Sequence, residues 1–202
     1  MRIGIDFDNT IVSYDALFHK VAREQGVVPP ETPVSKVAVR DYLRRLDREA
    51  IWTEMQGYVY GVRMNEAKIY AGVTDFMRRA ADKGDTLVII SHKTIRPFLG
   101  PQYDLHAAAR SWVERHLLIH NAPLIPPGHV YFELTKEAKL SRIGAIGCDI
   151  FIDDLPEILQ SEAFPEDVRR ILFDPESRHV NSGIANAAVC NSWAKIEAML
   201  YA

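Results

Sequence analysis

The chain has 202 residues, of which 48% are hydrophobic and 25% charged, and its formal net charge is −3 at pH 7. This composition is typical of a globular protein and excludes wholesale disorder. The negative charge argues against nucleic-acid binding driven by overall charge, although it leaves room for a local basic groove. The length suits one domain, or a core domain with a modest insertion.

The cysteines and the start of the chain indicate a compartment. Cys148 and Cys190 are the only two cysteines, and they lack CxxC spacing, so neither a zinc site nor a disulfide framework is indicated. The chain begins with a strand pattern instead of a basic segment followed by an apolar one, and no apolar run approaches the length of a membrane span. We therefore expect a cytoplasmic protein without a membrane partner.

The first expected element is a strand over Arg2–Phe7, in which apolar residues alternate with small or acidic ones. Asp6, Asp8, Asn9 and Thr10 lie at its carboxyl end. Two neighbouring carboxylates beside an apolar segment are costly unless a cation or a shared proton relieves their repulsion. A turn in which Asp8 and Asn9 bond their own backbone is the alternative. We favour a catalytic interpretation because supporting residues follow later in the chain.

Residues 13–71 interrupt the strand pattern. They contain helical patterns over Ala16–Glu24 and Val34–Ile51 but no convincing buried strand. An insertion of this size after the first strand is expected to form a small helical lid. The predicted domains are therefore a core domain of 1–12 and 72–202, with 13–71 as a helical cap domain.

Further apolar runs after the insertion are expected to form strands, with helical patterns between most of them. This alternation is typical of a parallel sheet with helices on both faces, so we predict an α/β protein with a Rossmann-like sheet. Ligands of such sheets bind at the carboxyl ends of the strands, so the residues that close each run are informative. The runs are Thr86–Ser91, His129–Glu133, Asp149–Asp153 and Arg169–Asp174, with a possible edge strand at Ala187–Cys190.

The second strand ends at Ser91, whose hydroxyl can donate to an anionic oxygen, as can the backbone amides that follow. A serine after a strand is also commonly a turn or helix cap. His92 and Lys93 stand beside it as candidates for contacting substrate, with simple surface exposure as an equal alternative.

The segment after the third strand places two lysines at the start of a helix. Thr135 is a good N-cap, so Lys136 and Lys139 lie in the first turns, where a positive charge is unfavourable for the helix dipole. That local cost is expected if an ammonium group must face a phosphate and a carboxylate. Two solvated lysines are the alternative. The lysines share one helical face, and the sequence does not choose between them.

The fourth strand closes with Asp153 and Asp154, followed by Leu155 and Pro156. Adjacent acids after a buried run indicate a hard cation such as Mg²⁺, which prefers oxygen ligands. A capping role for Asp154 ahead of Pro156 is the structural alternative. We favour the metal site for the pair.

Together these residues resemble the ordered four-motif set of the haloacid dehalogenase-like (HAD) phosphohydrolases. The motifs are Asp6-Phe7-Asp8-Asn9-Thr10, then Ser91, then Lys136 or Lys139, then Asp153-Asp154, and they span most of the expected core. The resemblance implies a Rossmann-like core with a small helical cap inserted after the first motif. It also implies bound Mg²⁺.

The resemblance further implies a role for each motif. Asp6 is the expected nucleophile, which becomes an aspartyl-phosphate. Asp8 is expected to protonate the leaving oxygen and later activate water, while its backbone carbonyl helps to hold the metal. Dehalogenases of the superfamily lack an aspartate at that position, so its presence favours phosphate ester hydrolysis. The remaining expected site residues bind the phosphoryl group (Asn9, Thr10, Ser91, His92 and Lys136 or Lys139) or complete the metal site (Asp153, Asp154 or both).

The predicted function is that of a Mg²⁺-dependent phosphatase for a small phosphorylated metabolite, either a nucleotide or a sugar phosphate. Attack by a carboxylate on a dianionic phosphate is opposed by like charge, so a metal ion and an ammonium group are needed, and the motifs supply both. The alternatives are a phosphotransferase or phosphomutase of the same fold, and a catalytically silent phosphate-binding module. The sequence leaves the oligomeric state open.

Other polar patterns are given structural interpretations. A basic stripe recurs every fourth residue at Lys36, Arg40, Arg44 and Arg48, and we interpret it as a solvated helix face balanced by nearby acids instead of a surface for anionic ligands. Arg63 is included among the substrate contacts only as a guess. His116 and His120 have a spacing that can bind metal, but no third ligand stands near, so no metal is expected there.

Overall fold

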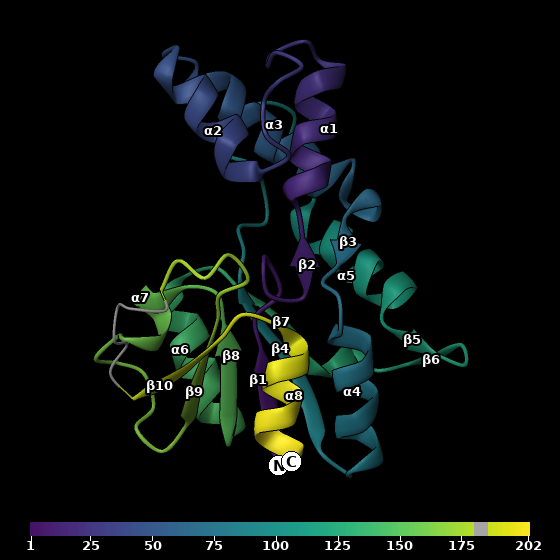
Figure 1. Ribbon diagram of the computed structural model, residues 1–202. Coiled ribbons are helices and arrows are strands. Elements are labelled where there is room, and N and C mark those ends of the chain that lie inside the picture. Colours follow the sequence, from purple (N-terminus) through teal and green to yellow (C-terminus); the bar gives the residue numbers. More distant parts are fainter. Residues whose placement is uncertain (180–185) are drawn as a thin grey trace. The chain divides into compact units, whose positions relative to one another are not determined.

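The computed structural model describes residues 1–179 and 186–202, and the chain forms two compact units (Figure 1). The sheet unit comprises Met1–Val12, Ile69–Lys93 and Leu117–Ala202. The helical unit comprises Ser13–Lys68 and Thr94–His116. The predicted cap of 13–71 corresponds to most of the helical unit, and residues 94–116, which the prediction includes in the core domain, cluster with that unit.

The sheet unit contains a six-stranded parallel sheet in the order β10-β9-β8-β1-β4-β7. This confirms the predicted α/β class, and each expected strand is present with ends shifted by no more than a residue or two. The central strand β1 lies between β8 and β4, so the first and fourth motifs are on neighbouring strands. The strands are β1 (Arg2–Ile5), β4 (Thr86–His92), β7 (Val130–Glu133), β8 (Ile150–Asp153), β9 (Arg169–Phe173) and β10 (Ala187–Cys190).

Helices cover both faces of this sheet, as predicted. Helices α6 (Lys136–Ile146) and α7 (Pro156–Leu159) bury Leu140, Ile158 and neighbours in a core cluster that includes Leu172 of β9. The next residue of β9, Phe173, points to the opposite face, because successive side chains alternate along a strand. There its ring lies 5.6 Å from that of Trp193 in α8 (Trp193–Tyr201), which also packs on α4 (Val73–Asp82).

The helical unit is built from α1 (Asp15–Glu24), α2 (Lys36–Arg45), α3 (Glu49–Gly61), the 3₁₀ turn η1 (Met64–Glu66) and α5 (Leu105–His116). The single helical pattern expected over 34–51 is wrong, since two helices share it. The backbone turns between them at Asp47, which adopts a left-handed conformation with φ +56°. The amide of Arg48 then donates to Leu43 O over 2.9 Å and closes the first helix.

Two glycines explain why the segment after β4 packs with α3 of this unit. A Cβ atom at Gly57 would lie 2.7 Å from Pro97 Cβ, and one at Gly61 would lie 2.5 Å from Tyr103 Cβ. Only glycine permits approaches this close, because real Cβ atoms are excluded at such distances. The buried indole of Trp112 in α5 adds a hydrogen bond of 2.9 Å to Ala67 O.

Two residues of the basic stripe form ion pairs within this unit, in agreement with the structural interpretation. Arg40 pairs with Asp41 at 2.8 Å, and Arg44 pairs with Glu49 at 2.6 Å. Arg48 lies outside α2, at the N-cap of α3. The stripe is therefore shorter than expected, because the helix that carries it ends earlier.

Short elements complete the chain: β2 (Val12–Ser13) with β3 (Lys68–Ile69), β5 (Leu118–Ile119) with β6 (Ala122–Pro123), and the 3₁₀ turn η2 (Pro127–His129). In the described ranges, none of the helices combines the length and the apolar character needed to cross a bilayer.

Candidate active site

The loop after β1 is a tight turn that fixes both acids of the first motif. The amide of Asp6 donates to Ile152 O of β8 over 2.9 Å, and the amides of Ile11 and Val12 both donate to Phe7 O over 3.1 Å. Asn9 takes the left-handed conformation with φ +60°, which asparagine tolerates better than most residues. Backbone hydrogen bonds therefore hold this turn, and it presents the two acids.

The carboxylate of Asp6 accepts two hydrogen bonds from residues of other motifs. Ser91 Oγ, at the end of β4, donates to Asp6 Oδ1 over 2.9 Å, and Lys139 Nζ donates to the same oxygen over 2.6 Å. Lys139 also donates to Asp153 Oδ2 over 2.6 Å. One ammonium group therefore joins the carboxyl ends of the first and fourth motif strands.

The structure distinguishes the two lysines that the sequence left equivalent. Lys139 is 1% exposed, whereas Lys136 is exposed and pairs with Glu157. Thr135 caps α6 as expected, accepting from Ala138 N over 3.1 Å. Lys139 therefore lies one turn inside the helix, and long helical side chains point back toward the N-terminus. That direction leads to Asp6.

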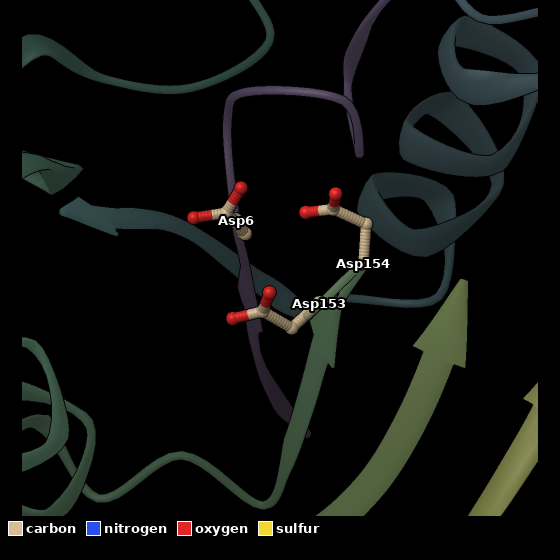
Figure 2. Close-up of side chains that lie close together, drawn as sticks. All are labelled: Asp6, Asp153 and Asp154. Atoms are coloured by element: carbon tan, nitrogen blue, oxygen red, sulfur yellow. The ribbon is translucent and has the colours of Figure 1, made fainter. Parts of the chain in front are cut away.

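Three carboxylates gather at the carboxyl ends of β1 and β8 (Figure 2). Asp6, Asp153 and Asp154 each offer an oxygen atom, and these atoms lie within 4.8 Å of one another. Thr10 Oγ1 donates to Asp154 Oδ1 over 3.3 Å, and Leu155 N donates to Asp153 Oδ1 over 2.9 Å. Over residues 1–179 and 186–202, it is the one group of three such side chains placed to hold a metal ion.

Burial dominates the electrostatics of these groups. Desolvation raises the pKa of Asp6 from 3.8 to about 7, with Asp153 and Asp8 adding to the rise and Lys139 opposing it. Burial alone lowers the pKa of Lys139, but Asp153 and Asp6 outweigh it and hold that pKa above its ordinary value. The lysine therefore stays an ammonium group, while the nucleophile candidate is only partly compensated by the protein.

Asp8 has a different partner. Lys93 Nζ donates to Asp8 Oδ2 over 2.7 Å, and Lys93 is 5% exposed. The simple surface exposure considered for Lys93 is therefore wrong. Its ammonium group binds an acid of the first motif.

One pocket of the sheet unit collects most of the residues that the sequence singled out. His92 lines this pocket, and its Nε2 atom lies 3.1 Å from Leu134 O. Burial lowers the pKa of this imidazole. Leu155 and Ile158 add an apolar side that the motifs did not reveal. The lining residues are Asp6, Asp8, Asn9, Ser91, His92, Lys136, Lys139, Asp154, Leu155 and Ile158.

Arg63 is not among these residues. It lies in the helical unit, where it binds Glu24 over 2.7 Å and also pairs with Glu66. The hydrogen bond from Arg63 holds the pKa of Glu66 down at about 2. These bonds hold Arg63 within that unit, and its contact with substrate stays a prediction.

Solved structures with the same fold cover nearly the whole chain. A predicted phosphatase from Clostridium acetobutylicum has 16% identity and a TM-score of 0.60, with 98% of this chain and 97% of that chain covered. A phosphoserine phosphohydrolase-like protein from Francisella tularensis has 14% identity and a TM-score of 0.61, covering 100% and 99%. A HAD family hydrolase from Deinococcus radiodurans, solved with bound phosphate and sodium, has 15% identity and a TM-score of 0.56, covering 98% and 94%.

These likenesses show that the chain has the fold of HAD-superfamily hydrolases, as the motifs predicted. No family model matches the sequence, and no curated protein matches it. The chemistry of this chain is therefore argued from its own residues.

Proposed function

We propose that this protein is a Mg²⁺-dependent phosphatase that hydrolyses a small phosphorylated metabolite through an aspartyl-phosphate on Asp6. The observation that carries the proposal is the buried bridge from Lys139 to Asp6 and Asp153, at 2.6 Å on each side. A fold maintained by packing alone seldom buries an ammonium group among carboxylates, because the desolvation cost is several kcal/mol per ion. Such a cluster is expected where charge must be balanced during a reaction.

Asp6 is the nucleophile in this proposal. Both of its hydrogen bonds, from Ser91 and Lys139, are accepted by Oδ1, so Oδ2 keeps its lone pairs for attack on phosphorus. The bond between phosphorus and Oδ2 forms as the ester bond breaks, and the leaving oxygen takes the proton from Asp8, which acts in this step in its protonated, carboxylic acid form. Ser91 and Lys139 supply donors for the negative charge of the phosphoryl group.

The second step returns the enzyme to its starting state. Asp8, which lines the same pocket, removes a proton from water as the water oxygen attacks phosphorus. The bond between phosphorus and Asp6 breaks, and inorganic phosphate leaves. One carboxyl group thus serves as acid in the first step and base in the second.

The donor set fits a divalent metal ion with oxygen ligands. The site contains four carboxyl groups, those of Asp6, Asp8, Asp153 and Asp154. In the described part of the chain, two buried ammonium groups, those of Lys93 and Lys139, pair with them. The raised pKa of Asp6, caused first by burial and also by Asp153, indicates that the protein alone does not neutralise this charge. The proposed ligands are Asp6, the backbone carbonyl of Asp8, and Asp153, Asp154 or both. When bound, Mg²⁺ would lower the repulsion between the carboxylate and the phosphate dianion.

The helical unit is the proposed cap domain. The chain leaves the sheet unit for it after Val12 and again after Lys93. The crossing after Val12 lies two residues past Thr10 of the first motif, and the crossing after Lys93 lies two residues past Ser91. A rearrangement of the helical unit would therefore be transmitted directly to the site, as in lids that exclude water. Nucleotides and sugar phosphates both remain within the proposed substrate class, and a cytoplasmic location stays a prediction.

The test is a panel of nucleotides, sugar phosphates and phosphorylated acids, with phosphate release measured in Mg²⁺ and then in EDTA. The Asp6→Asn variant should lose turnover, and the matched Asp82→Asn change in α4 should not. Phosphate release by Asp6→Asn at the wild-type rate would refute the nucleophile, and undiminished release in EDTA would refute the metal. Phosphorylated alcohol or sugar acceptors among the products would indicate a transferase instead.

A further inference from the structure

The ends of β1 and β4 make the same contact twice. These strands are parallel neighbours, with Ile5 paired to Ile89. Just beyond the paired residues, Ser91 Oγ donates to Asp6 and Lys93 Nζ donates to Asp8, and the two residues of each pair are separated by the same 85 positions. Lys93 and Asp8 each lie two residues beyond the members of the first pair, so the second contact has the same offset along the chain as the first.

Lys93 is held firmly enough to act as a fixed point. Its backbone amide donates to Glu133 O of β7 over 2.8 Å, which extends the strand pairing past the end of β4. The side chain is 4% exposed, and its ammonium group lies 5.8 Å from the ring centre of Phe7. Lysine is almost never buried to this degree unless it is paired. The Asp8 side chain is 22% exposed by comparison, so the lysine is the better anchored partner.

We propose that Lys93 is the positioning residue for Asp8, which it holds where the leaving oxygen of the substrate must receive its proton. This inference rests on the proposed phosphatase function. Ser91 orients the nucleophile and Lys93 orients the acid, so one strand end sets both reacting groups of the neighbouring strand. A misplacement of about 1 Å can cost on the order of 10²-fold in rate.

The choice of leaving group distinguishes a residue that positions Asp8 from one that binds the phosphoryl group and from one that only stabilises the fold. A nitrophenolate leaves without a proton, whereas the alkoxide of an alkyl phosphate needs one from the general acid. A residue that acts through Asp8 therefore matters for alkyl esters and little for aryl esters. A residue that binds the phosphoryl group, or one that only stabilises the fold, affects both kinds of ester alike.

The experiment compares kcat/KM for p-nitrophenyl phosphate and glycerol 2-phosphate in the wild type, Lys93→Met, Lys93→Gln and the control Lys83→Met, which changes an exposed lysine. The value of kcat/KM reports the steps up to phosphoryl transfer to Asp6 and does not include the later hydrolysis of the phosphoryl enzyme. For Lys93→Met we expect a loss of about 10- to 100-fold with the alkyl ester and less than about threefold with the aryl ester. Equal losses with the two esters would overturn the proposal.

A double variant tests whether Lys93 acts through Asp8. In an Asp8→Asn background, adding Lys93→Met should change the alkyl ester rate by less than about twofold, because the group being positioned is already absent. A further loss of about tenfold would mean that Lys93 acts on the substrate itself. If Lys93→Met does not fold by circular dichroism, Lys93→Gln carries the same comparison.

Failure of the proposed function would look different. If the proposed phosphatase function is wrong, the wild type will hydrolyse neither ester, or Asp6→Asn will retain the wild-type rate. The positioning role is then tested by the crystal structure of Lys93→Met or Lys93→Gln. Displacement of the Asp8 carboxylate from its wild-type position supports the role, and an unmoved carboxylate overturns it.

Discussion

Replacing Lys139 by methionine should remove a large part of the stability of this protein. The ammonium group donates to Asp6 and Asp153 over 2.6 Å each, and the three side chains are 1%, 6% and 0% exposed. Removing one partner from a buried ion pair costs about 3–5 kcal/mol, because the remaining charge is left uncompensated. Total stabilities of folded proteins are about 5–15 kcal/mol. Lys139→Met should therefore lose at least about a fifth of the free energy of unfolding, and more if the total stability lies at the low end of that range.

The assay is urea unfolding in EDTA at about pH 8, where the unpaired carboxylates are least able to take up protons. Lys136→Met is the matched control, because it removes an exposed lysine three positions earlier that pairs with exposed Glu157. Exposed pairs contribute about 0–1 kcal/mol, so this variant should stay close to the wild type. The double variant Lys139→Met/Asp6→Asn should recover part of the loss, since it removes one of the unpaired charges. If Lys139→Met and Lys136→Met unfold within about 1 kcal/mol of each other, the reasoning from burial is refuted.

Three further predictions follow from the site and the core. Burial raises the pKa of Asp6 from 3.8 to about 7, so its contribution to stability is complete below about pH 4 and is lost as the pH rises through 7. Unfolding in EDTA should therefore show the stability of the wild type falling relative to that of Asp6→Asn between these pH values. A constant difference between the two proteins would contradict this prediction. Binding of Mg²⁺ near pH 7 should release protons. Calorimetry should therefore give binding heats that change with the ionisation enthalpy of the buffer, and equal heats in all buffers would contradict this prediction. A Cβ at Gly4 would lie 2.5 Å from Phe151 Cδ2, so Gly4→Ala should destabilise by about 1–3 kcal/mol, while Gly128→Ala, with open space around it, should leave the thermal midpoint unchanged.

The strands of the sheet could be predicted because each is a short apolar run closed by turn or acidic residues. The placement of α5 (Leu105–His116) could not. Its helical period shows an apolar face but does not say what covers that face. The decisive contacts, such as the one between Gly61 and Tyr103, join segments that are distant in the chain. Tertiary packing of this kind leaves no local signal in the sequence.

The acids of the site could also be predicted, because parallel strands collect ligands at their carboxyl ends. The choice between Lys136 and Lys139 could not, since both lie near the start of one helix, and burial separates them only in the folded chain. The sequence indicates that Lys93 stands beside the site but not which group it binds. Its contact with Asp8 follows from the Ser91–Asp6 contact only once β1 and β4 are known to be parallel neighbours. Asp8 lies in the turn beyond β1, so the path of that turn also has to be known.

The most direct test of the central claim is to trap the covalent phosphoryl enzyme. After rapid mixing with a hydrolysed ester from the panel and Mg²⁺, borohydride reduces an aspartyl-phosphate to homoserine, and mass spectrometry of the digested protein locates the change. The account predicts homoserine at position 6 in the wild type and in Asp82→Asn, and none in Asp6→Asn. Reduction at another residue, or turnover without any reducible acyl-phosphate, would contradict it.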